Sequence, residues 1–266
     1  MTTVGAEASK FAVGDEVYFA GDITRQGSYA EFVAVDERLV GRKPRRLSFD
    51  EAAAVPLTAL TAWEGLIEMI QADRGDAGTG GRVCLIVGGG GGAGSMAIQI
   101  AKQVCGLQVI ASASRPDSAA FCKRMGADIV INHQHPMVDQ ITQLGMSGAD
   151  YIFSTARLGN FPDLVASLNP LGKICCILSG DEAKRLDVSG LFPIRGTLAF
   201  ELMFTRPRTG LELERQGDIL DRVATLIDGG TLVSTMTHVY PWTSVQEAHR
   251  AIETGHTVGK IVMRVD

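Results

Sequence analysis

The chain has 266 residues, of which 45% are hydrophobic and 21% charged, and its formal net charge is -5. Its lysines and arginines are scattered and no apolar run reaches the about 18–20 residues that cross a bilayer, which argues against a nucleic-acid-binding face and a membrane span. The five cysteines are odd in number and lack C-x-x-C spacing. They are therefore expected to be reduced core thiols in a cytoplasmic protein.

The N-terminal part predicts short antiparallel strands at residues 14–19 and 28–35, separated by glycine turns. Ser48 and Glu51 have the spacing of a capping box, which is typical of a helix start. Pro56 is expected to interrupt that helix, because proline lacks the backbone N–H that a helix interior needs.

From residue 82 onward, short apolar runs alternate with segments of helical periodicity. The predicted strands are 82–87, 107–111, 128–131, 150–153 and 173–178. Helices are predicted at 95–104, from Pro116 to the capping Gly126, at 137–144 and at 161–168. This alternation predicts an α/β, doubly wound parallel sheet covered on both faces. Two amphipathic helices (213–227 and 244–252) and a closing strand (260–265) follow.

A run of glycines lies between the first of these strands and the first helix. Five consecutive glycines follow Val87, and then come Ala93 and Gly94. Such a turn brings a dinucleotide pyrophosphate to the helix N-terminus, whereas a flexible linker would not be flanked by buried apolar runs. The candidate pyrophosphate-binding residues are Gly89, Gly91, Gly92, Ala93 and Gly94.

The end of the second strand indicates which dinucleotide binds. NAD-binding domains usually carry an acidic residue there to hold the ribose hydroxyls. Here the strand ends in Ser112, Ser114 and Arg115, and the first carboxylate is Asp117, beyond Pro116. Two hydroxyls and a guanidinium favour a 2′-phosphate, so NADP(H) is the predicted cofactor. The alternative is that Arg115 is a solvated loop residue.

Several motifs together resemble the medium-chain dehydrogenase/reductase superfamily, and within it the zinc-independent, quinone-oxidoreductase-like branch. They are G-D-E-V-Y (14–18), G-S-Y-A-E-F (27–32), A-A-V-P-L-T-A-L-T-A-W (53–63), the glycine turn, G-A-D-I-V-I-N-H (126–133), E-L-M-F-T-R (201–206) and G-K-I-V (259–262). The resemblance implies a Rossmann domain over 59–204 and a partial GroES-like β-rich catalytic domain over 1–58. The C-terminal segment 205–266 is expected to belong to that catalytic domain as well.

Compared with that family, the chain resembles a member truncated at its N-terminus. The segment that family members carry before the stretch matching 4–19 is absent, and with it much of the substrate pocket and two zinc ligands. A catalytic cysteine ligand would fall near Leu57, which has no donor atom. The resemblance therefore implies a protein without metal, and chelation by His133 and His135 is a minor alternative.

The resemblance also assigns roles to individual residues. Thr61 is expected beside the nicotinamide as the catalytic residue, although its hydroxyl has the alternative of bonding its own helix backbone. The remaining assignments are His133 at the adenosine end, Ser154 and Thr155 at the nicotinamide ribose, Leu178 and Phe200 lining the nicotinamide pocket, and Lys260 near the cofactor or the domain junction.

The function implied is an NADPH-dependent transfer of hydride to a quinone or an α,β-unsaturated carbonyl compound. A homodimer is expected through an edge strand near 196–204, with no nucleic-acid or membrane partner. Two alternatives remain open. One is a cofactor-binding sensor or scaffold without turnover, and the other is a zinc-dependent alcohol dehydrogenase.

Overall fold

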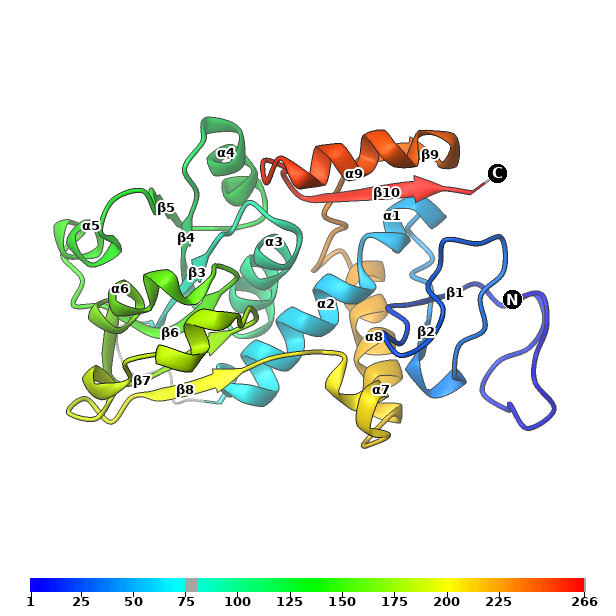
Figure 1. Cartoon of the computed structure of the whole chain (residues 1–266), viewed down its shortest axis with the longest axis horizontal. Coiled ribbons are helices and arrows are strands. Elements are labelled where there is room, and N and C mark those ends of the chain that lie inside the picture. Colours follow the sequence, from blue (N-terminus) through cyan, green and yellow to red (C-terminus); the bar gives the residue numbers. More distant parts are fainter. Residues whose placement is uncertain (75–80, 266) are drawn as a thin grey trace. The chain divides into compact units, whose positions relative to one another are not determined.

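The structure is a computed structural model that describes residues 1–74 and 81–265. It contains two compact units (Figure 1). Unit 1 comprises Met1–Leu60 and Met203–Asp266, and unit 2 comprises Thr61–Leu202. Among the described residues, no helix is long and apolar enough to cross a membrane.

Unit 2 is built on a six-stranded sheet in which every neighbouring pair of strands is parallel. The spatial order is β5-β4-β3-β6-β7-β8. The strands are β3 (Val83–Val87), β4 (Gln108–Ser112), β5 (Ile129–Ile131), β6 (Ala149–Ser154), β7 (Leu168–Cys176) and β8 (Thr197–Phe200). All five residues of β3 are buried, as expected for a central strand with both faces covered. The predicted doubly wound sheet is confirmed.

Helices connect these strands (Figure 1). They are α3 (Gly92–Gln99), α4 (Pro116–Arg124), α5 (Met137–Gln143) and α6 (Phe161–Ala166), with the π-helical segment η3 (Ile100–Val104) and 3-10 turns η4 (Leu158–Asn160), η5 (Asp181–Arg185) and η6 (Ser189–Leu191). Helix α2 (Pro56–Trp63), which begins in unit 1 and ends in unit 2, and the π-helical segment η2 (Glu64–Met69) precede β3. Helix α3 contacts α4, and α5 contacts α6. From β3 to β5 each new strand is added on one side of β3, and from β6 to β8 each new strand is added on the other side. Because the crossovers are right-handed, the pair α3 and α4 and the pair α5 and α6 cover opposite faces of the sheet.

The ends of α4 follow the signals in the sequence. Pro116 is its first residue, where the missing N–H costs nothing, and Gly126 follows its end with a φ of +107° that glycine adopts without strain. The helix predicted over 95–104 instead begins at Gly92 and continues as the π-helix η3. The glycine run therefore contributes the first helical turn itself.

Unit 1 contains two small sheets and the helices packed on them (Figure 1). β1 (Val17–Phe19) pairs antiparallel with β2 (Val40–Arg42), and β9 (Met236–Pro241) pairs parallel with β10 (Lys260–Arg264). The helices are α1 (Phe49–Ala53), α7 (Thr205–Thr209), α8 (Glu214–Asp228) and α9 (Val245–Glu253), with 3-10 turns η1 (Glu37–Leu39) and η7 (Trp242–Ser244). Helix α8 packs on β2, and the buried Tyr18 hydroxyl donates to the Leu220 carbonyl at 2.7 Å.

The strand predicted over 28–35 is wrong. Its expected partner β1 pairs with β2 instead, and no described strand pairs with 28–35. Tyr29 and Phe32 in this segment are 56% and 71% exposed. Alternating side chains make a strand only where a neighbouring strand satisfies the backbone N–H and C=O groups, and no described strand does so for this segment.

The predicted capping box is confirmed. The Ser48 hydroxyl accepts from the Glu51 N–H at 3.3 Å, and the Glu51 carboxylate accepts from the Ser48 N–H at 2.9 Å. Helix α1 ends at Ala53 and α2 begins at Pro56, so the predicted interruption at the proline is also confirmed.

Candidate cofactor-binding site

The glycine turn after β3 is shaped by close contacts within unit 2. A Cβ on Gly88, whose φ is +78°, would collide with the Thr155 hydroxyl, and a Cβ on Gly94 would collide with the Gly88 carbonyl oxygen. A Cβ on Gly89 would lie 2.9 Å from the Ala111 Cβ. Glycine is therefore required at these three positions by the fold itself, whether or not a ligand binds.

Gly91 is different. Its φ is -82°, which any residue adopts, and the nearest atom to a Cβ placed there is the Gly88 oxygen at 3.7 Å. No contact with the protein requires glycine here, so the space beside Gly91 is open to a ligand that approaches the backbone. A dinucleotide pyrophosphate makes that kind of approach.

Gly91 is also the N-cap of α3, and no side chain caps this helix. The N–H groups of the first turn lack intrahelical acceptors and carry the positive end of the helix dipole. The predicted pyrophosphate residues Gly92, Ala93 and Gly94 form this turn. An uncapped helix start beside an open glycine fits a bound diphosphate.

The end of β4 holds the turn in place. The Gly88 N–H donates to the Ser112 hydroxyl at 3.0 Å, and the Gly89 N–H donates to the Ser112 carbonyl at 3.0 Å. The Ser112 hydroxyl also lies 3.2 Å from Nδ1 of His133, which follows β5. Residues at the carboxyl ends of three neighbouring strands therefore meet at Ser112, the last residue of β4, which is fully buried.

Strand β6 holds the turn from the other side. The Thr155 N–H and hydroxyl both donate to the Val87 carbonyl, at 3.1 and 2.9 Å. The order of connection reverses between β3 and β6. In sheets of this kind, ligands bind beyond the carboxyl ends of the strands at that reversal.

The candidates for the nicotinamide side lie along the same edge of the sheet. In the strand register Ser154 pairs with Cys176, and Cys176 pairs with Phe200. Leu178 follows two residues after Cys176, and Leu178 and Phe200 are 42% and 45% exposed. The structure thus brings Ser154, Leu178 and Phe200 to the edge of the sheet that carries the glycine turn. The apolar side chains of Leu178 and Phe200 are exposed there and could contact a ligand.

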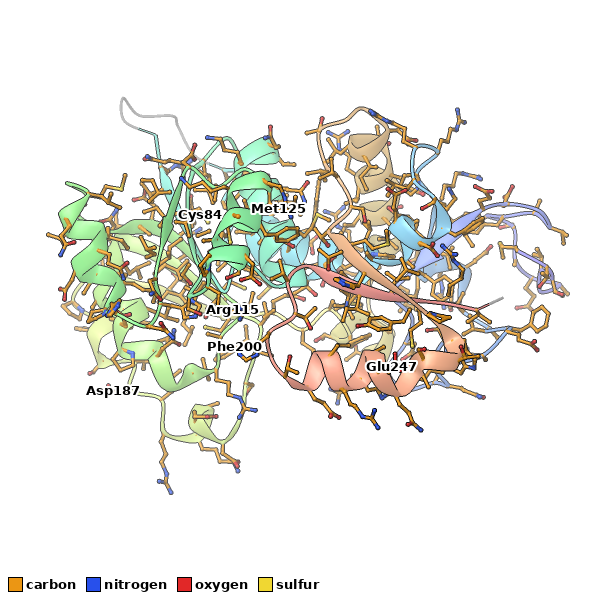
Figure 2. The ribbon with its side chains drawn as sticks, turned by 90° about the horizontal axis from the view of Figure 1, so that it is seen from above. Cys84, Arg115, Met125, Asp187, Phe200 and Glu247 are labelled. Atoms are coloured by element: carbon orange, nitrogen blue, oxygen red, sulfur yellow. The ribbon has the colours of Figure 1, made fainter. Side chains whose placement is uncertain are left out.

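Arg115 has an acidic neighbour in Asp117, the first carboxylate after β4, although Pro116 separates the two in the sequence. It is the N-cap of α4 and lies beyond the end of β4 (Figure 2). Its Nε is 3.3 Å from Oδ1 of Asp117, and the two side chains are 33% and 62% exposed. The half-buried Ser114 precedes it. This ion pair was not predicted from the sequence. The signal for it was that Arg115 and Asp117 are two residues apart and lie on either side of the first residue of α4.

The imidazole of His133 has a pKa below its ordinary value. Partial burial is the main cause, and the nearby Arg115 guanidinium acts in the same direction, while the hydrogen bond with Ser112 opposes both. The lowered pKa favours the neutral form of the ring, beside the Arg115 guanidinium.

The two remaining candidates lie elsewhere in the chain. Thr61 is 7% exposed on α2, in unit 2, and Lys260 is the first residue of β10, in unit 1. Burial lowers the pKa of the Lys260 ammonium. Their roles beside the cofactor stay predictions.

The donor set does not fit zinc. Within residues 1–74 and 81–265, no group of three or more His, Cys, Asp or Glu side chains is placed to hold a metal ion. His133 and His135 belong to no such group, and Leu57 offers no donor. Catalytic zinc needs three protein ligands, so no step of the chemistry is assigned to a metal here.

The family model of zinc-binding dehydrogenases matches residues 125–263 of the chain. A zinc-type alcohol dehydrogenase-like protein of Staphylococcus aureus is 35% identical over 268 residues, which cover 98% of this chain and 79% of that protein. The match includes the glycine turn, the end of β4 and most of unit 1, so it extends over both units.

Two further relatives carry names that bear on the chemistry. A mitochondrial NAD(P)H oxidoreductase of Mus musculus is 28% identical over 277 residues, covering 98% of this chain and 67% of that protein. The solved structure of the quinone oxidoreductase of Coxiella burnetii is 26% identical, with a TM-score of 0.79, and covers 99% of this chain and 76% of that one. The similar proteins are thus oxidoreductases.

Proposed function

Since the chain belongs to the medium-chain dehydrogenase/reductase superfamily, we propose that it is an NADPH-dependent reductase of a quinone or an α,β-unsaturated carbonyl compound. The observation that carries the proposal is the glycine turn. Four features coincide there: the open Gly91, the uncapped start of α3, the contact with Ser112, and the position at the reversal of the sheet.

In this proposal the residues of unit 2 bind and orient the nucleotide. The N–H groups at the start of α3 would hold the pyrophosphate, and Ser114 and Arg115 would hold the 2′-phosphate. The fully buried Ser112, which was also expected at the 2′-phosphate, supports the turn instead. His133 would contact the adenosine ribose, and Ser154 and Thr155 the nicotinamide ribose. The bound nicotinamide supplies the hydride, and the protein supplies position and surroundings.

In the same proposal, the hydride acceptor is bound by Leu178, Phe200 and Thr61. The two exposed apolar side chains would exclude water from the face of the nicotinamide, while the Thr61 hydroxyl would orient the acceptor. A quinone or enone accepts hydride without a metal if it is held flat against the ring. The name of the Coxiella burnetii relative supports a quinone, and the proposed reaction is independent of zinc.

We also propose a homodimer formed through β8. This strand pairs only with β7 in the described chain, so its other edge leaves N–H and C=O groups unpaired. Such an edge favours pairing with a second copy. Sedimentation equilibrium tests this proposal, and a protein that stays monomeric at tens of micromolar would contradict it.

The test of the proposed function is oxidation of NADPH by this chain with a simple quinone and with a simple enone. We expect turnover that survives dialysis against a chelator. Nucleotide binding without turnover on either acceptor would favour the sensor alternative. Turnover that needs added zinc would favour the alcohol dehydrogenase alternative.

A further inference from the structure

Asp117 faces the guanidinium that the proposed function assigns to the 2′-phosphate. Its Oδ1 is 3.3 Å from Arg115 Nε and also accepts the Ser118 N–H at 2.7 Å. Asp117 is the second residue of α4, where a carboxylate is stabilised by the helix dipole. The backbone contact therefore holds the carboxylate beside Arg115.

A phosphate dianion and a carboxylate compete for the same cation. To bind Arg115, a 2′-phosphate must share the guanidinium with Asp117, and like charges at this range repel. The two side chains are 33% and 62% exposed, so water and salt screen the pair and it is easily rearranged. The carboxylate therefore weakens phosphate binding without preventing it.

We propose that Asp117 is a specificity-determining residue that reduces the preference of the chain for NADPH over NADH by competing with the 2′-phosphate for Arg115. This inference rests on the proposed function. NADH has ribose hydroxyls where NADPH has the phosphate, so the competition acts on NADPH alone.

The same geometry changes what the Arg115→Ala variant measures. That variant removes the guanidinium that would bind the 2′-phosphate. It also leaves the Asp117 carboxylate without the Arg115 cation, next to the incoming phosphate. Part of the lost affinity for NADPH is then repulsion by Asp117. The double variant Arg115→Ala/Asp117→Asn removes both groups and separates the two effects.

The test measures dissociation constants of NADPH and NADH by calorimetry for the natural chain, both single variants and the double variant. Asn is chosen at 117 because its carbonyl oxygen can still accept the Ser118 N–H. We expect Asp117→Asn to bind NADPH about two- to fivefold more tightly, as removal of a screened ion pair implies, with NADH unchanged. The double variant should bind NADPH more tightly than Arg115→Ala.

The matched control is Asp139→Asn. Asp139 is an exposed residue in the first turn of α5, as Asp117 is in α4, and it carries the same charge change without facing Arg115. It should leave both constants unchanged, and raised ionic strength should shrink the Asp117 effect.

The results that overturn the inference are distinct from failure of the proposed function. An Asp117→Asn protein that binds NADPH no more tightly than the natural chain overturns the inference. Equal changes for both nucleotides, or an equal gain from Asp139→Asn, also overturn it. If the folded natural chain binds neither nucleotide, the proposed function fails and the inference fails with it.

Discussion

The Gly88 N–H donates to the buried hydroxyl of Ser112 at 3.0 Å and thereby joins the glycine turn after β3 to the end of β4. The same hydroxyl contacts His133. The Ser112 side chain thus fixes the conformation of the turn together with Thr155, and it connects the turn to the loop after β5. Preorganisation of this kind is what a turn needs to present several N–H groups to one diphosphate.

Replacing Ser112 with Ala should weaken both the fold and nucleotide binding. The partly buried Gly88 N–H would lose its acceptor, at a cost of about 1 kcal/mol in the free energy of unfolding. Urea unfolding and a nucleotide titration measure the two effects. Ser147→Ala removes an exposed hydroxyl before β6 and is the control. A Ser112→Ala protein as stable as that control would contradict the role of the contact.

Gly91→Ala and Gly94→Ala should separate binding from folding. The Cβ at 91 meets no atom closer than 3.7 Å, so that variant should keep its thermal midpoint while its affinity for nucleotide falls at least about tenfold. The Cβ at 94 collides with the Gly88 oxygen, so that variant should lose about 1–3 kcal/mol of stability. If Gly91→Ala binds nucleotide normally, the pyrophosphate does not approach that position.

The Asp128 carboxylate should contribute stability that depends on pH. Burial raises its pKa, but the Lys102 ammonium at 2.7 Å and the Val109 N–H at 2.8 Å outweigh burial and hold the pKa below the usual range. A lowered pKa stabilises the folded state above the unfolded value of about 3.9 and loses that effect as pH falls through the folded value.

Asp128→Asn should therefore lower the free energy of unfolding at pH 7 by up to about 1 kcal/mol, since the pair is partly exposed. The difference from the natural chain should shrink as acid protonates the carboxylate. Urea unfolding between pH 7 and pH 3 measures it, with Asp218→Asn, on the exposed side of α8, as the control. A difference that grows toward acid would reverse the assigned sign.

The five thiols should be unreactive in the folded chain. Burial raises the pKa of Cys122 and Cys176 to about 11 and that of Cys105 to about 12, and it raises the pKa of Cys84 and Cys175 further above the usual value. Since the thiolate is the nucleophile, iodoacetamide at pH 8 should label the native chain slowly and all five thiols in urea. Mass spectrometry counts the adducts, and fast stoichiometric labelling of native protein would contradict this burial.

The sheet was predictable because buried strands and amphipathic helices leave strong periodic signals, as in β3 and α4. The contacts between loops could not be predicted from the sequence. Whether Ser112 meets Gly88 depends on the register between β3 and β4, and whether Asp117 meets Arg115 depends on side-chain orientation at the start of α4. The segment at 28–35 has strand-like alternation, but pairing is a tertiary property, and no described strand pairs with this segment.

Calorimetric titration of the folded chain with NADPH tests the central claim most directly. We predict saturable binding at one site per chain, with circular dichroism confirming the fold in the same sample. A chain that is folded by that criterion yet shows no saturable heat with NADPH or NADH would contradict the assignment of the Gly88–Gly94 turn as a diphosphate site.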